Sequence, residues 1–213
     1  LNGGVRPNLY AIGDSAALTS EVLDFIANGS VKLRADLQSI ADDLADAKEY
    51  GSIIDVSPVD FGALLARFEE IRAGDYNDLF EAASRQLALN TVLPLVRQAQ
   101  VMAQKYDVVV TNPPYMGASG MNNKLANYVK ANYPNTKSDM STVFMEKARK
   151  MCKNAGYMSM INIPVWMFLS SYEKLRGDLI AYNTFANMVH LGRGIFGSDF
   201  GTTAFVITKC HIS

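Results

Sequence analysis

The stretch KYDVVVTNPPYMG, from Lys105 to Gly117, constrains the fold more than any other part of the sequence. Its run of β-branched residues predicts a strand at Tyr106–Thr111. The two prolines that follow cannot continue that strand, because proline fixes φ and has no backbone N–H, and they do not begin an ordinary helix. The segment therefore predicts a strand that ends abruptly in a stiff loop.

Short apolar runs alternate with helical patterns through the rest of the second half, which is typical of strands joined by crossover helices. We expect strands at residues 106–111, 156–163, 187–191 and 202–209, and helices at residues 123–133, 139–154 and 171–182. The pattern predicts an α/β fold with a mostly parallel sheet. Ligands bind beyond the carboxyl ends of such strands, so Asn112–Tyr115 is a candidate site by position alone.

The first half has a mainly helical pattern between residues 15 and 104. Helices are predicted at residues 31–50 after Ser30, at residues 58–73 after Ser57, and at residues 77–104, where Pro94 kinks or splits the helix. A short strand is predicted at Asn8–Ile12, and Asp14 or Ser15 could cap a helix that follows it.

The composition is that of a globular chain. It has 213 residues, of which 49% are hydrophobic, enough for a real core. Cys152 and Cys210 lie far apart without ligand spacing, which supports neither a disulfide framework nor a metal site and favours a cytoplasmic setting. No apolar run is long enough to span a bilayer, so we expect no membrane partner. The start at Leu1, without Met, predicts an internal fragment.

Charge is distributed unevenly along the chain. Residues 1–105 carry nine Lys or Arg against fifteen Asp or Glu, whereas residues 106–213 carry eleven against six. The basic excess of the second half suits contacts with phosphates, and Lys124, Lys130 and Lys137 are candidates. A solvated helix face is the alternative explanation for these lysines.

The loop itself is rich in hydrogen-bond acceptors. Its two prolines remove two backbone donors, which leaves carbonyl groups and the side chain of Asn112 to accept hydrogen bonds. A rigid loop of acceptors that ends in the aromatic ring of Tyr115 suits an exocyclic amine on a flat ring.

These residues resemble those of a known family. NPPY after a hydrophobic strand resembles the catalytic motif of S-adenosylmethionine-dependent DNA amino-methyltransferases of the adenine-N6 branch. The similarity runs from Lys105 to Lys209, through KSDMSTVF and GRGIFGSDFGTT, to the PglX family of bacteriophage-exclusion systems. It implies a partial Rossmann-like methyltransferase fold. In that fold residues 1–14 hold a strand, residues 15–104 form a helical insertion, and residues 105–213 form the C-terminal half of the catalytic domain.

The resemblance also implies a chemistry. S-adenosylmethionine would be the cofactor, double-stranded DNA the substrate, and proteins of a defence system further partners. Asn112, Pro113, Pro114 and Tyr115 would form the catalytic loop. The Asn112 side-chain oxygen and the Pro113 carbonyl would accept both N–H groups of adenine N6, while Tyr115 would stack on the flipped base. The sulfonium methyl group is already activated, so positioning and charge stabilisation suffice and no metal is required.

Three further residues occupy family-like positions. Asp14 resembles a position that contacts the adenine of the cofactor, and Asp139 resembles an acidic position near the cofactor. The alternative for each is a structural role at a helix N-terminus. Phe196 falls where related enzymes supply a second aromatic wall for the flipped base, with Phe200 as its rival. Packing in the core is the alternative for Phe196, and it is the expected role of Trp166 and Tyr172.

The resemblance also indicates what the chain lacks. The family's glycine-rich cofactor loop, of the type DPACGSG, is not found in this sequence, so we expect the cofactor site to be incomplete. In the family topology, two absent strands would lie between the strand at Leu9–Ile12 and the strand at Asp107–Thr111. The second of these strands should then have an open edge, compensated by dimerisation, strand exchange or the helical region.

Two other functions fit the same residues. The loop could present its acceptors to an RNA adenine or to a glutamine side chain of a protein. Alternatively, the basic second half could serve a noncatalytic nucleic-acid-binding module, whose DNA binding would survive the change Asn112→Ala.

Overall fold

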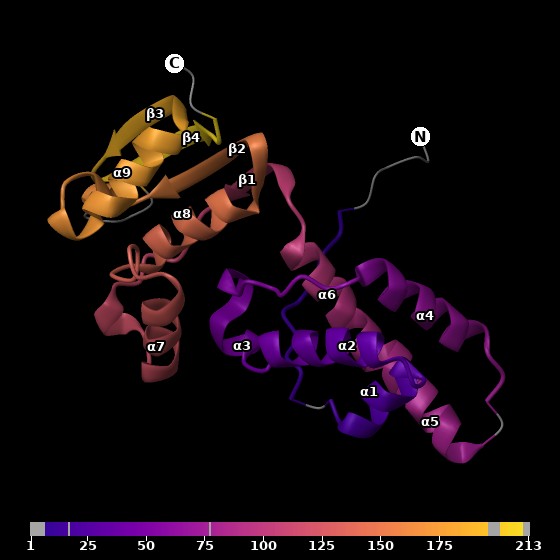
Figure 1. Cartoon of the computed structure of the whole chain (residues 1–213). Coiled ribbons are helices and arrows are strands. Elements are labelled where there is room, and N and C mark those ends of the chain that lie inside the picture. Colours follow the sequence, from indigo (N-terminus) through magenta and orange to yellow (C-terminus); the bar gives the residue numbers. More distant parts are fainter. Residues whose placement is uncertain (1–6, 17, 77, 196–200, 211–213) are drawn as a thin grey trace. The chain divides into compact units, whose positions relative to one another are not determined.

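The computed structural model describes residues 7–16, 18–76, 78–195 and 201–210 of the chain. The chain divides into two compact units, Leu1–Ala103 and Gln104–Ser213. The first unit is helical and the second contains a sheet (Figure 1).

The helical unit has its apolar side chains packed between short helices. Its helices are α1 Ser20–Ala27, α2 Val31–Asp43, α3 Ala47–Tyr50, α4 Phe61–Ala73, α5 Leu79–Leu87 and α6 Leu93–Ala103, with a 3-10 turn at Gly51–Ile53 and a π-helical turn at Ala88–Val92. Residues such as Ile26, Leu37, Leu64, Phe68 and Val96 are fully buried in this unit. The apolar faces of α1, α2, α4 and α6 therefore supply its core.

Helices α2 and α4 of this unit begin after residues whose side chains cap them. Ser30 caps α2 as predicted, by accepting a hydrogen bond from the Leu33 amide at 3.3 Å. The predicted start of α4 after Ser57 is wrong, because Asp60 is its cap and accepts from the Ala63 amide at 3.0 Å. Ser57 instead donates its amide to Asp43 at 2.6 Å, which holds it outside the helix.

The predicted long helices are interrupted. The helix expected at residues 31–50 ends at Asp43 and resumes at Ala47. The predicted effect of Pro94 is confirmed, since a π-helical turn at Ala88–Val92 separates α5 from α6 directly before it. A proline cannot donate to the carbonyl four residues earlier, and a wider turn accommodates that loss.

The strand predicted at Asn8–Ile12 does not form. Residues 7–14 are irregular, and the side chain of Leu9 is 86% exposed. A strand requires a paired neighbour, and none is present in the described part of the chain. The helix expected directly after Asp14 also begins later, at Ser20.

The sheet unit alternates strands and helices. It consists of β1 Tyr106–Thr111, α7 Asn123–Asn132, α8 Met140–Met151, β2 Cys152–Asn162, α9 Glu173–Tyr182, β3 Thr184–Gly192 and β4 Thr202–Thr208, with 3-10 turns at Ala118–Gly120, Pro164–Met167 and Ser170–Tyr172. Every predicted strand and helix of the second half is present, with shifted ends except for β1.

Three of the four described strands run in one direction, as the prediction of a mostly parallel sheet requires, and β4 is the exception. The strand order is β1-β2-β4-β3; β1 and β2 are parallel neighbours, and β3 runs in the same direction as both. Strand β4 lies between β2 and β3 and runs antiparallel to both. The chain returns from β3 through a hairpin and inserts β4 into the sheet, and a hairpin necessarily reverses direction. The sheet is therefore mixed.

The predicted open edge of β1 is confirmed. It is an end strand of the sheet, and Val108 and Val110 are 57% and 71% exposed. The face of the sheet opposite to Val108 and Val110 is covered by helices. Helices α8 and α9 pack there around a core of Met145, Ala148, Met158, Met160, Trp166, Tyr172, Leu175, Leu179, Phe205 and Ile207. Trp166 and Tyr172 pack in this core as predicted.

None of the helices in the described residues combines the length and the apolar character that crossing a membrane requires.

Candidate active site

The NPPY loop begins where β1 ends (Figure 1). Asn112 and Pro114 are exposed, Pro113 is buried, and the ring of Tyr115 is 38% exposed. The buried Pro113 anchors the loop, while its neighbours present polar and aromatic groups to solvent. The loop therefore offers a fixed acceptor and a flat ring at the carboxyl end of a strand.

Asn112 and Tyr115 interact within the loop. The Tyr115 hydroxyl donates a hydrogen bond to the Asn112 side-chain oxygen at 3.2 Å. This contact fixes the amide of Asn112 with its oxygen toward Tyr115. Partial burial raises the pKa of the Tyr115 hydroxyl, so it remains a neutral donor across the physiological range.

The segment after the loop is tied to the start of α8. The Ala118 amide donates to the Ser138 carbonyl at 3.0 Å, and the Met140 amide donates to the Met116 carbonyl at 2.9 Å. These bonds form a short antiparallel bridge between Gly117 and Asp139. Two predicted site residues from different segments, Tyr115 and Asp139, are thereby brought to one place.

Asp139 is the N-cap of α8. Its carboxylate oxygen Oδ1 accepts hydrogen bonds from the Ser141 amide at 2.8 Å and from the Ser141 hydroxyl at 2.6 Å. Asp139 is buried, and Ser141 is fully buried. The cap explains the helix start, since the predicted start after Ser138 is one residue early.

A cavity of about 480 Å³ opens beside these residues. Its lining consists of Tyr115, Gly117, Asp139, Ile163, Pro164, Val165, Arg193 and Gly201. One wall is apolar and comes from the segment that follows β2, and the other walls carry the Tyr115 ring, one carboxylate and one guanidinium. Such a lining suits a flat, partly polar ligand.

Sequence reasoning missed part of this lining. Pro164 and Val165 follow the carboxyl end of β2, and Arg193 and Gly201 flank the turn between β3 and β4. The rule that singled out Asn112 applies equally to the end of β2, so Pro164 and Val165 could have been found. Arg193 required knowledge of the antiparallel hairpin.

The remaining candidates are not among the residues that line this cavity, or they fall outside the described residues. Asp14 belongs to the helical unit, where it pairs with Lys48 at 2.9 Å. The hydrogen bond from Lys48 lowers the pKa of the Asp14 carboxyl. Lys124, Lys130 and Lys137 are exposed on α7 and the segment after it. Phe196 and Phe200 lie outside the described residues.

Potential metal ligands do not gather anywhere in the described ranges. No group of three or more His, Cys, Asp or Glu side chains there could hold a metal ion.

Comparison with known proteins shows the family to which the chain belongs. The model of the Eco57I restriction-modification methylase family matches residues 33–196, which include the NPPY loop, Asp139 and most of the cavity lining. The chain belongs to this methylase family. The match confirms the resemblance to methyltransferases that the sequence indicated.

Two curated relatives of this chain are considerably longer than the chain itself. The adenine-specific methyltransferase BrxX of Escherichia coli O9:H4 (strain HS) is 42% identical over 78% of this chain, and PglX of Lacticaseibacillus casei (strain Zhang) is 32% identical over 96%. The matches span 14% and 17% of these relatives' own length. Among solved structures, the ATP-dependent Type ISP restriction-modification enzyme LlaBIII bound to DNA has 14% identity and a TM-score of 0.40, covering 84% of this chain and 13% of that enzyme.

Proposed function

We propose that this chain supplies the base-binding part of an enzyme that methylates adenine N6 in double-stranded DNA. The observation that carries the proposal is the exposed Asn112 oxygen beside the Tyr115 ring, at the end of β1 in a methylase family member. The names of the two curated relatives support adenine as the substrate. A phage-defence or restriction-modification system would be the setting, in the cytoplasm, with other proteins of that system as partners.

Asn112 and Pro113 would hold the reacting amine. The lone pair of adenine N6 is delocalised into the ring, so the nitrogen is a poor nucleophile. Two acceptors that bind both N–H groups, the Asn112 oxygen and the Pro113 carbonyl, would localise that pair on the nitrogen. A carbonyl oxygen has two lone pairs, so Asn112 can accept from adenine while it still accepts from Tyr115.

Tyr115 and Pro114 would complete the loop. The exposed ring of Tyr115 lines the cavity together with Pro164 and Val165, which leaves room for a base between aromatic and apolar surfaces. Stacking of a base on an aromatic side chain is worth about 1–3 kcal/mol, which offsets part of the cost of flipping the base. Pro114 would keep the loop rigid, and Phe196 is proposed as a second wall.

S-adenosylmethionine would be the methyl donor, and it supplies an activated sulfonium methyl group when bound. The residues present fit part of this cofactor, because the buried Asp139 carboxylate lines the same cavity as Tyr115 and retains an acceptor oxygen beyond the Ser141 bonds. Asp139 would orient the cofactor by accepting from one of its N–H or O–H groups. Asp14 is proposed as a contact to the cofactor's adenine ring.

Lys124, Lys130 and Lys137 are proposed to contact DNA phosphates. All three are exposed on α7 and the segment after it. Phosphate contacts release counterions, so affinity for DNA should fall steeply as the salt concentration rises. Replacing all three lysines with alanine should reduce that dependence, and an unchanged salt response would remove them from the DNA interface.

The experiment is methyl transfer from labelled S-adenosylmethionine by the complete protein that contains this chain, with DNA, RNA and protein as acceptors. We expect label on DNA adenine only. Tyr115→Phe keeps the ring and should retain most activity, whereas Tyr115→Ala should lose roughly tenfold to a hundredfold. Label on RNA or on glutamine would reassign the substrate. Binding of DNA without any methyl transfer would favour a noncatalytic module.

A further inference from the structure

Three strand ends meet at the cavity beside Tyr115. Strands β1, β2 and β3 run in one direction, because β4 is antiparallel to both of its neighbours. Their carboxyl ends therefore lie at one edge of the sheet, and each is followed by part of the cavity lining: Tyr115 after β1, Pro164 after β2 and Arg193 after β3. Ligands bind at such an edge. The segments after β1 and β2 have a role in the proposed function, whereas Arg193 has none.

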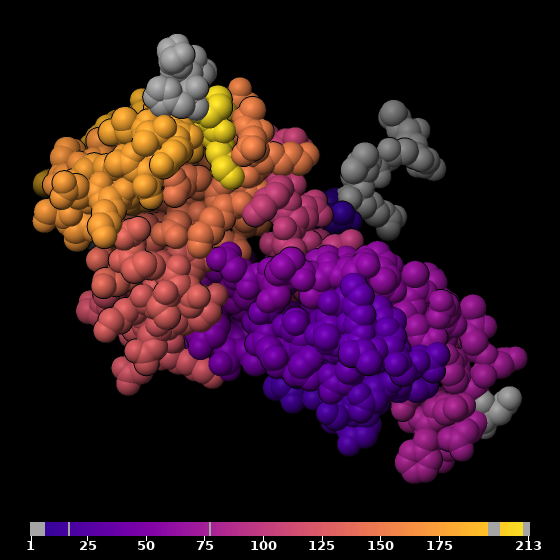
Figure 2. Space-filling model, viewed as in Figure 1, coloured from indigo at the N-terminus to yellow at the C-terminus, as the bar shows by residue number. Residues whose placement is uncertain are grey.

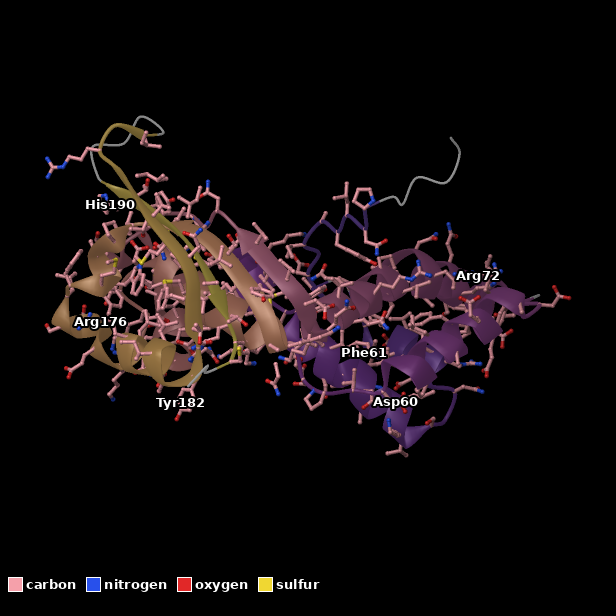
Figure 3. All side chains as sticks on the ribbon, turned by 90° about the horizontal axis from the view of Figure 1, so that it is seen from above. Asp60, Phe61, Arg72, Arg176, Tyr182 and His190 are labelled. Atoms are coloured by element: carbon pink, nitrogen blue, oxygen red, sulfur yellow. The ribbon has the colours of Figure 1, made fainter. Side chains whose placement is uncertain are left out.

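The turn that carries Arg193 is fixed by its neighbours. Gly192 and Gly194 have φ angles of 78° and 81°, a left-handed backbone that favours glycine on both sides of the arginine. The Gly192 amide donates a hydrogen bond at 3.1 Å to Nδ1 of His190, which is labelled near the end of β3 in Figure 3. The ring of His190 also lies against Gly201, where an added Cβ atom would be 2.8 Å from it. The turn is therefore constrained on both sides of Arg193.

The guanidinium of Arg193 has no acidic partner in the described part of the chain. It is exposed, and neither a hydrogen bond nor an ion pair joins it to another described residue. Asp139 lines the same cavity, but its carboxylate accepts from Ser141 and forms no ion pair with Arg193. Figure 2 shows the orange atoms of β3, the strand before the turn, at the surface of the sheet unit. An exposed cation beside a cavity for a flat ring can bind an anionic group that belongs to the ligand.

We propose that Arg193 binds the backbone phosphate next to the adenine that enters the cavity. This inference rests on the proposed function. A flipped base enters a pocket while its sugar and phosphates stay in the strand, so these phosphates lie at the mouth of the cavity. Arginine binds a phosphate through two parallel hydrogen bonds, which fix its orientation as well as neutralise its charge. Arg193 thereby holds the nucleotide, while Asn112 holds the amine of its base.

Two other anions could meet a guanidinium at this place, and the observations favour the phosphate over both. The carboxylate of S-adenosylmethionine belongs to a small ligand, which a binding site largely encloses, whereas Arg193 is exposed. A carboxylate from the rest of a longer protein would have to approach the cavity lining, where a polypeptide segment would take space that the base needs. A phosphate of the substrate strand meets neither objection, because it arrives with the base.

The test replaces single phosphates of a DNA duplex by neutral methylphosphonates, next to the adenine that the complete protein methylates. One of these changes should weaken DNA binding by the wild type roughly tenfold. Arg193→Ala should cost a similar factor on unmodified DNA and nothing more on that methylphosphonate duplex, since both changes remove one contact. It should also reduce the slope of log affinity against log salt by about 0.9. Arg193→Lys keeps the charge without the paired bonds and should recover part of the affinity.

Lys153→Ala is the matched control. It removes the same charge near the amino end of β2, where Lys153 pairs with Asp107 at 2.9 Å, and should leave the methylphosphonate effect unchanged. Urea unfolding establishes that each variant is folded, and Arg193→Gln replaces Arg193→Ala should the latter fail to fold.

Three outcomes would overturn the inference while leaving the proposed function intact. The first is a wild-type protein that methylates DNA and tolerates every methylphosphonate. The second is a pair of changes whose effects multiply in full, because Arg193 would then bind a different group. The third is an Arg193→Ala protein that loses affinity for S-adenosylmethionine and not for DNA. A wild-type protein that methylates no DNA adenine would refute both the inference and the proposed function.

Discussion

Two substitutions of Asp139 can separate a structural role of its carboxylate from the proposed role in binding the cofactor. It caps α8 through two hydrogen bonds to Ser141, and it lines the cavity beside Tyr115. Asparagine caps a helix as well as aspartate does, so Asp139→Asn removes the charge and keeps the cap. Asp139→Ala removes both, and the pair of variants distinguishes the two roles.

The expected cost of Asp139→Ala follows from the two lost bonds. Loss of the cap costs about 1 kcal/mol. The Ser141 hydroxyl is fully buried and loses its acceptor, which adds about 1–2 kcal/mol. The sum is about 2–3 kcal/mol, and a urea slope of about 2 kcal/mol/M converts it to a fall of roughly 1 M in the unfolding midpoint.

Urea unfolding followed by Trp166 fluorescence measures this cost directly, because Trp166 is the single tryptophan and lies in the core that α8 covers. Asp139→Asn should unfold within about 0.5 kcal/mol of the wild type. Equal destabilisation by the two variants, or an Asp139→Ala chain as stable as the wild type, would refute the capping role. In the complete protein, Asp139→Asn should weaken S-adenosylmethionine binding without changing stability.

Further predictions concern the core, the thiols and the loop. Phe205→Ala should destabilise the sheet unit by about 3–5 kcal/mol, because Phe205 is buried against Trp166 and Phe185, whereas Val206→Ala on the open face should cost less than about 1 kcal/mol by urea unfolding. Burial raises the pKa of the Cys152 thiol, so a thiol reagent should label Cys210 first and Cys152 only on unfolding or at alkaline pH; equal rates would contradict the burial. Because the folded pKa of Cys152 lies above the unfolded value, its contribution to stability is present below the unfolded pKa and is lost as pH rises through the folded pKa, which urea midpoints measured against pH would detect. Tyr115→Phe should leave the unfolding midpoint within about 1 kcal/mol of the wild type, since it removes one partly exposed hydrogen bond.

Local signals in the sequence predicted local structure well. Strand β1 has its predicted bounds, because β-branched residues favour a strand and two prolines end it. Helix α7 begins at its predicted residue, Asn123, because the side chain of Asn122 accepts a hydrogen bond from the Leu125 amide at 2.9 Å and caps it. Both boundaries depend only on neighbours in the chain.

Features that depend on distant partners could not be predicted in the same way. The apolar pattern of β4 is the same whether it runs parallel or antiparallel to β2, so the pattern alone could not give its direction. The residues Asn8–Ile12 have a strand composition but no strand beside them in the described residues. Arg193 reaches the cavity only because the hairpin brings it there, and its neighbours in sequence carry no signal of that.

The central claim is that Asn112 holds the amine that receives the methyl group. The most direct measurement is the rate of methyl transfer to adenine N6 of duplex DNA by the complete protein, with wild-type Asn112 and with Asn112→Ala. The account predicts a loss on the order of a hundredfold to a thousandfold with DNA affinity unchanged, as when one stabilising hydrogen-bond group is removed from an active site. Turnover by Asn112→Ala at the wild-type rate would contradict it.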